Sequence, residues 1–355
     1  MKKTDLAAYN KYIRKKWIVL LVMVGLLFAS AIASLSVGSA KVSIPDILRT
    51  VFGGGTRQQN AIIWNVRMPR VATAMVVGIA LALSGCVMQN VLRNPLASAS
   101  TLGVSQGASF GAAVAIVYFG AGIQVNAGGA SSALTVTNPA MVTLCAFLGG
   151  IATTAIILGL ARFRGTSPAT MVLAGVAISS MFTGATTLIQ YFADEVQLST
   201  LVFWTFGDLG STGWEDLGGM AVIVAVLCVY CILHRWDFNA LLSGEETAIS
   251  LGINVKRLTL VNMVLCCLCS SVIVSNVGLI SFIGLVAPHI VRMVVGNNHV
   301  YLIPGSILGG ATLLLLGDLF ARTVISPVIL PIGAITSFLG GPLFLYLLFK
   351  GGKRP

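Results

Sequence analysis

The sequence predicts an all-α integral membrane protein with about ten transmembrane helices. Only 9% of its 355 residues are charged, against about 25% in a typical soluble domain. Hydrophobic residues make up 56% of the chain, and the mean hydropathy is +0.93. Polar groups are therefore too few to cover a surface that faces water on all sides. This composition excludes a soluble enzyme, a disordered chain and, despite the net charge of +11, a nucleic-acid-binding protein.

Ten apolar runs are long enough to be spans, at roughly 20 residues per crossing with short loops between them. The expected spans are residues 17–37, 71–91, 102–119, 139–160, 168–189, 217–233, 258–277, 280–295, 302–320 and 329–349. A cleaved signal peptide is the alternative for the first run, but about 20 apolar residues exceed the usual signal core. We therefore treat residues 1–355 as a single transmembrane domain.

Basic residues gather at the two chain ends, and this distribution predicts the topology. Residues 1–16 carry only one acidic residue, and residues 350–355 carry none. Positive residues that flank spans stay on the cytoplasmic side. We therefore expect both termini in the cytoplasm, with an even number of crossings. The basic residues concerned are Lys2, Lys3, Lys11, Arg14, Lys15, Lys16, Lys350, Lys353 and Arg354.

The segment between the first two spans departs from this rule. Between Lys41 and Arg70 the basic residues far outnumber the acidic ones, yet the topology places this segment outside. Part of it has helical apolar spacing, with Ser43 as a plausible N-cap and three glycines from Gly53 as a stop. We expect a short helix that lies flat on the outer face. Either the first predicted span does not cross the membrane, or the cations around this helix have a functional role.

Two parts of the chain, residues 71–190 and 258–349, resemble each other in outline. Each starts just after a pair of basic residues and soon reaches a break that contains a proline, Pro95 in the first part and Pro288 in the second. With ten spans the two parts run in opposite directions, which is the inverted-repeat plan of many transporters.

Glycines recur at four-residue spacing along the third predicted span, at Gly103, Gly107 and Gly111. In lipid, helices associate through van der Waals contact, and small residues at this spacing let two backbones touch. The pattern predicts close helix packing. A lining of the substrate path is the alternative.

The predicted spans carry almost no chemistry of their own. Asp318 is the only acidic residue inside a span, and Arg322 follows four residues later, where the two can pair. The sequence contains no P-loop, metal-ligand cluster or catalytic set. We therefore expect no enzyme, and uphill transport would take its energy from another chain. The alternative is a secondary transporter that is driven by an ion gradient through Asp318.

A cytoplasmic loop at residues 236–257 indicates where that other chain attaches. Ser243 and Glu246 have capping-box spacing, and Gly252 is a suitable C-terminal stop, so a short helix is expected between them. An apolar patch on an exposed helix favours a protein partner, and the alternative is that it lies against lipid headgroups or the chain's own spans. The apolar residues are Leu241, Leu242, Ile249 and Leu251.

Several motifs follow one another in a fixed order from about residue 37 to residue 348. In the first half they are Arg67-Met68-Pro69-Arg70, Ala82-Leu83-Ser84-Gly85, Arg93-Asn94-Pro95-Leu96-Ala97 and Leu102-Gly103-Val104-Ser105. In the second half they are Gly244-Glu245-Glu246, the run from Phe282 to Arg292, Asp318 with Ala321-Arg322, and Gly341-Pro342. Together they resemble the FecCD-type permeases, the membrane subunits of type II ABC importers. The departures are Gly317, where alanine is commoner, and a long loop at residues 122–138.

The resemblance implies a permease that pairs with a second copy or a paralogue, with two cytoplasmic ATPase subunits and with an extracytoplasmic binding protein. ATP and magnesium would be bound by the ATPases, so no cofactor is expected in this chain. The implied ATPase-coupling residues are Leu241, Leu242, Ser243, Gly244, Glu245, Glu246, Ala248, Leu251 and Gly252. The implied docking residues for the binding protein are Arg67, Arg70 and Arg322, for which headgroup anchoring is the alternative.

The resemblance leaves the substrate open among iron-siderophores, haem, cobalamin and oxyanions. Because the spans hold no metal-ligand cluster, we expect a chelate to pass intact rather than a bare ion to be coordinated. Our first hypothesis is the permease subunit of an ATP-driven importer of an iron-siderophore or a haem-like chelate.

Overall fold

The computed structural model describes residues 3–38, 42–121, 123–125, 134–136, 138–164, 168–326 and 328–351. Lys2, Lys41, Lys353 and Arg354, which entered the topology prediction, lie outside these residues. The elements are α1 (Lys3–Ser36), α2 (Ile44–Val51), α3 (Arg57–Ile62), the π-helix η1 (Ile63–Arg67), α4 (Met68–Val91), α5 (Val104–Val117), β1 (Ile123–Val125), β2 (Leu134–Val136), α6 (Pro139–Arg164), α7 (Pro168–Tyr191), α8 (Glu195–Phe206), α9 (Trp214–Leu233), α10 (Arg235–Leu242), α11 (Glu245–Ser250), α12 (Val255–Val277), α13 (Ile283–Val295), α14 (His299–Thr323) and α15 (Ile332–Gly351).

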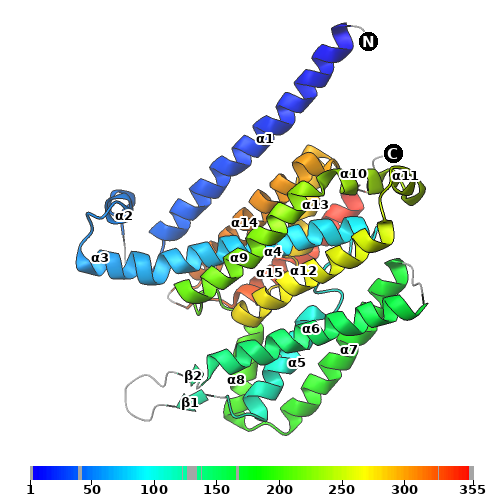
Figure 1. The fold of residues 1–355 in the computed structure, drawn as a ribbon. Coiled ribbons are helices and arrows are strands. Elements are labelled where there is room, and N and C mark those ends of the chain that lie inside the picture. The colour runs from blue at the N-terminus through cyan, green and yellow to red at the C-terminus, as the bar shows by residue number, and fades with distance from the viewer. Residues whose placement is uncertain are drawn as a thin grey trace.

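Within the described residues, seven helical segments are long and apolar enough to cross a membrane. Three shorter apolar helices, α5, α13 and α15, complete the set. These ten segments follow the ten predicted spans in order, so the predicted helical membrane fold is confirmed. Figure 1 shows them as one bundle, from which the N-terminal part of α1 leans away.

The bundle has two ends that differ in the helices they carry (Figure 1). We call the end with α2, α3 and Arg322 the outer end, and the end with α10 and α11 the inner end, following the predicted topology. Helix α1 runs between them: the ammonium of Lys16 lies 4.8 Å from the ring of Tyr301 near the inner end, and Val37 accepts a hydrogen bond from Arg322 at the outer end.

The two halves of the chain share one local design. In the first, the long helix α4 is followed by a loop and by the 14-residue α5, which begins after Gly103 in the left-handed conformation. In the second, α12 is followed by a loop and by the 13-residue α13, which begins after Phe282 in the same conformation. Because α4 starts at the outer end and α12 starts beside α11 at the inner end, the two halves run in opposite directions.

Glycines bring α5 and α6 into backbone contact. A Cβ atom added at Gly107 would clash with Thr153 and with the carbonyl of Gly149, and one added at Gly111 would clash with the carbonyl of Cys145. Gly103 has a φ of +89°, which favours glycine. The three glycines therefore lie at a helix contact, where no side chain would fit.

Two features of the N-terminal region differ from expectation. The first helix starts earlier than the span predicted from residue 17, because residues 3–16 continue α1. The short outer helix α2 does form, with the side chain of Ser43 accepting a hydrogen bond from the backbone of Asp46. The second span, however, starts earlier than predicted, because α3, η1 and α4 are continuous from Arg57 to Val91.

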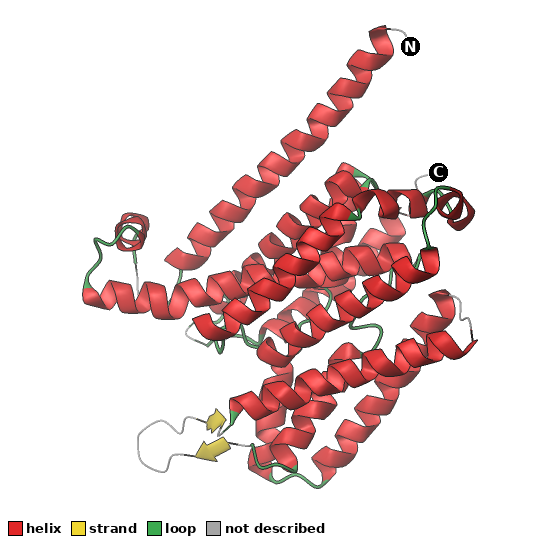
Figure 2. Cartoon of the chain, viewed as in Figure 1, coloured by secondary structure: helices red, strands yellow, loops and turns green. Residues whose placement is uncertain are grey.

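Two further elements escaped the sequence prediction. Helix α8 lies between the fifth and sixth spans and is capped reciprocally by Asp194 and Gln197. The loop at residues 122–138 contains an antiparallel pair, β1 and β2, which Figure 2 shows as the two strands of an otherwise helical chain in the part that is described. Residues 122, 126–133 and 137 of that loop lie outside the described residues.

Candidate functional site

A buried ion cluster occupies the outer end of the bundle. Asp318 on α14 is fully buried, and both of its carboxylate oxygens are paired. Arg70 lies 2.9 Å from Oδ1 through its Nη2, and Arg322 lies 2.9 Å from Oδ2 through its Nε. The predicted pair of Asp318 and Arg322 is confirmed, and α4 supplies a second cation that the sequence did not indicate.

The same cluster holds the C-terminal turn of α1. The last carbonyls of a helix have no partner inside the helix. Arg322 donates from Nη1 to the carbonyl of Val37 at 2.9 Å and from Nη2 to the hydroxyl of Ser34 at 2.6 Å. Arg67 donates from Nη1 to the carbonyls of Leu35 and Ser36. The arginines thus satisfy both a buried carboxylate and a helix end.

The cluster carries an excess of positive charge. Two guanidiniums pair with one buried carboxylate, Arg67 adds a third positive charge nearby, and the next acidic group, Asp208, lies 3.9 Å from Arg70 with 58% of its side chain exposed. The side chains of Arg70 and Arg322 are only 14% and 9% exposed. The three predicted docking arginines are therefore brought together, but they are largely buried in contacts within the chain rather than projecting from the outer face.

A cavity borders this cluster at Arg70. This cavity, of about 770 Å³, is lined by Arg70 and Asp208, by the aromatic side chains of α8, and by the loop that precedes α15. The aromatic residues are Phe203, Trp204 and Phe206. The sequence prediction missed this wall because it missed α8, although the capping spacing of Asp194 and Gln197 was a usable signal.

At the inner end the predicted cytoplasmic helix forms as α11, and a second short helix, α10, precedes it. The prediction that Ser243 caps one helix is wrong: Ser243 ends α10, and α11 begins after Gly244, which has a φ of +116°. Gly252, with a φ of +84°, does follow the end of α11. The chain turns sharply at Gly244 because this left-handed conformation costs glycine little.

The apolar residues of this loop divide into two groups. Leu241 and Ala248 are buried, as is Phe238 of α10, so they join the two short helices to the bundle. Leu242, Ile249 and Leu251 are 48%, 56% and 67% exposed, and form an apolar patch at the inner end. The expectation that Leu241 belongs to the exposed patch is wrong, because Leu241 packs into the core.

Contacts from the end of α4 fix these helices in place. The guanidinium of Arg93, which follows α4, lies 3.2 Å from the carboxylate of Glu245 at the start of α11. The side-chain amide of Asn90 donates to the carbonyl of Phe238 at 3.2 Å. Pro95 lies in the loop after α4, and Pro288 lies within α13. One helix thus reaches from the outer ion cluster to the inner patch.

No group of three or more histidine, cysteine, aspartate or glutamate side chains that could hold a metal ion is found in the residues that the structure describes. The arrangement offers buried ion pairs, a wide outer cavity and an apolar inner patch. These features suit movement and docking rather than bond chemistry.

The comparisons with known proteins match this chain to membrane transport proteins. Residues 26–350 match the model of the FecCD transport family. A chain from Methanocaldococcus jannaschii, described as an ABC transporter permease protein, is 48% identical over 98% of both chains. The hemin transport system permease protein of Yersinia pestis is 36% identical, over 92% of this chain and 93% of its own. A solved structure described as a metal-chelate type ABC transporter in an inward-facing conformation has a TM-score of 0.81 at 32% identity, over 94% of this chain and 99% of its own.

Replacement of Asp318 tests the role of the outer ion cluster. Asp318→Asn leaves the guanidiniums of Arg70 and Arg322 around a neutral group, so we expect a loss of stability of about 3–5 kcal/mol. Asp208→Asn is the control, because an exposed carboxylate near the same arginine contributes about 0–1 kcal/mol. The denaturation midpoint of the purified protein in detergent measures both. Equal midpoints for the two variants would show that the cluster is not a stabilising element.

Proposed function

Because this chain belongs to the FecCD transport family and is an ABC importer permease rather than an enzyme, we propose that it forms the pathway for an iron-siderophore or a haem-like metal chelate. A binding protein delivers the chelate at the outer end, and separate ATPase subunits act at the inner end. ATP and magnesium belong to those subunits. The family assignment argues against the alternative of a secondary transporter that is driven by an ion gradient. In addition, Asp318 is paired with two arginines rather than free to carry an ion.

The observation that carries the proposal is the inner patch. Leu242, Ile249 and Leu251 expose apolar surface on two short helices that are tied to the bundle by Arg93 and Glu245. An exposed apolar patch with a polar rim is typical of a protein interface. We infer that each ATPase subunit seats on this patch, and that its movement passes to α4 through the Arg93–Glu245 pair and the Asn90 contact.

A double substitution tests the ATPase contact. Glu245→Arg with Leu251→Asp should leave the protein inserted but reduce the ATPase that co-purifies with it at least about tenfold, since it reverses a charge and adds another to an apolar contact. Phe52→Asp is the control, because Phe52 is an exposed apolar residue of the outer end. Recovery of the ATPase is quantified after purification in mild detergent. Undiminished recovery with the double variant would refute this docking site.

The outer cavity and two of the compared proteins support a metal chelate as the cargo. The cavity of about 770 Å³ has an aromatic wall from α8, and the three aromatic side chains present apolar faces rather than metal ligands. A chelate that keeps its own metal ligands fits such a wall better than a bare ion does. The hemin permease and the metal-chelate transporter among the compared proteins support this assignment.

A second permease subunit is proposed to complete the pathway. Large apolar side chains remain exposed along α7 and α15, among them Leu173 and Leu188 of α7 and Phe338 of α15. In a bilayer, such faces contact either lipid or a second set of helices. We propose that a second copy or a paralogue packs there, in a cytoplasmic membrane with both termini and the inner end on the cytoplasmic side.

The outer ion cluster is proposed to receive the binding protein. With three arginines and one buried aspartate, the cluster attracts a further carboxylate, and Arg70 borders the open outer cavity through which one can approach. Arg67 and Arg322, which are more buried, add to the positive potential of the cluster. Charge pairing of this kind steers and orients a partner more than it adds affinity.

Neutralising Arg70 tests this docking site. Arg70→Gln should weaken capture of the binding protein about tenfold and reduce its salt dependence, because one steering charge is lost. The fold should persist, since Arg322 still pairs with Asp318. Arg57→Gln removes an exposed cation of the same end and serves as the control. Capture is measured with the permease in lipid nanodiscs at two salt concentrations, and equal capture by both variants would show that Arg70 is structural.

A further inference from the structure

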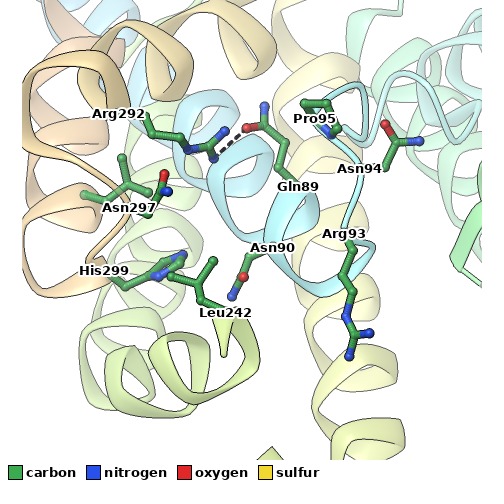
Figure 3. Close-up of a pocket in the computed structure, with 10 residues that line it drawn as sticks. Gln89, Asn90, Arg93, Asn94, Pro95, Leu242, Arg292, Asn297 and His299 are labelled. Carbon is green, nitrogen blue, oxygen red and sulfur yellow. Dashed lines mark hydrogen bonds between the residues drawn. The ribbon is translucent and has the colours of Figure 1, made fainter. Parts of the chain in front are cut away.

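A second cavity lies at the inner end, away from the outer ion cluster. It has a volume of about 310 Å³ and lies between the end of α4, the end of α13, the start of α14 and α10. Its lining holds two arginines and several amides but no acidic residue, as Figure 3 shows for those labelled. Its polar lining includes Gln89, Arg93, Asn94, Arg292 and Asn297.

Arg292 is the cation of this cavity that lacks a counter-ion. It donates from Nη2 to the Oε1 atom of Gln89 at 2.9 Å, and no acidic side chain pairs with it among the residues the structure describes. Arg93 differs, because Glu245 neutralises it. A guanidinium has five N–H donors in a planar fork that suits oxyanions. Arg292 therefore keeps both charge and donors for a ligand.

The amides of this lining are bonded within the chain to different extents, and Asn94 keeps free donors. The Oε1 atom of Gln89 is occupied by Arg292, and its Nε2 atom reaches the carbonyl of Gly284 at 3.3 Å. The Oδ1 atom of Asn94 accepts the backbone N–H of Leu96 at 2.9 Å, which leaves its Nδ2 donors unused. Asn297 lines the same cavity. Within the described residues, Arg292 and Asn94 thus keep unused donors in a lining that holds no carboxylate.

We propose that this cavity binds an oxyanion of the phosphate type, with Arg292 as the charged anchor. The volume exceeds that of a single phosphate, so the group can belong to a larger molecule. Two sources share this chemistry: free phosphate in the cytoplasm and the headgroup of an anionic phospholipid. Because Arg93 also borders the cavity and pairs with Glu245 of α11, a bound anion would lie beside the coupling contact. That last consequence rests on the proposed function, whereas the binding itself does not.

Binding of free phosphate is measured by thermal unfolding of the full-length chain in detergent, in sodium phosphate against sodium chloride at equal ionic strength. A ligand that binds only the folded state raises the melting temperature with concentration. We expect such a rise for the wild type, and for Arg292→Gln an apparent affinity at least about tenfold weaker, since a charge-assisted contact is lost. Arg257→Gln removes an exposed cation of the same end outside this cavity and should respond as the wild type does.

The lipid source is measured by native mass spectrometry after extraction from vesicles of phosphatidylglycerol or of phosphatidylcholine. Retention of phosphatidylglycerol by the wild type and by Arg257→Gln, but not by Arg292→Gln, identifies the headgroup as the ligand. Arg292→Lys keeps the charge and should retain part of either response, which separates loss of binding from loss of folding. Neither response in the wild type, or equal responses in the wild type and Arg292→Gln, would overturn the proposal. These readouts involve no transport, so their failure would leave the proposed function untouched.

Discussion

The fold depends on one buried carboxylate. Asp318 lies fully inside the bundle, where an unpaired charge would cost several kcal/mol, and Arg70 and Arg322 compensate it from α4 and α14. The remaining donors of Arg322, together with Arg67, satisfy the free carbonyls at the end of α1. Three helices that are distant in the sequence are thereby held at one point. The charges that fix the outer end also leave it positive, which is the property a carboxylate-bearing partner needs.

Helix α4 connects this cluster to the inner end. Its first turn carries Arg70, and its last turn carries Asn90, which holds α10, while Arg93 directly beyond it holds α11. Glycine contacts between helices, such as that of Gly85 in α4 with Gly284 in α13, bring backbones together. They leave little room for side chains to rearrange between the two ends. A displacement at the inner patch is therefore expected to reach the outer end as movement of whole helices rather than of single side chains.

The features that depend on composition and local spacing could be predicted from the sequence. Apolar runs predicted the spans, and Ser43 predicted the start of α2. The spacing of four residues predicted the pair of Asp318 and Arg322. The contact of Arg70 with Asp318 joins residues 248 positions apart, and no local pattern reports such a contact. The cap predicted at Ser243 was wrong because Gly244 adopts a positive φ and restarts the helix. Burial of Leu241 depends on packing against the bundle, which a hydrophobicity pattern does not show.

Uptake into membrane vesicles that contain this chain together with its ATPase and binding protein tests the central claim most directly. The energy source is varied by depleting ATP in one sample and by collapsing the proton and sodium gradients in another, with a ferric siderophore and haem as separate probes. The account predicts uptake that stops without ATP and continues without ion gradients. Uptake that continues without ATP and stops when the gradients collapse would contradict it.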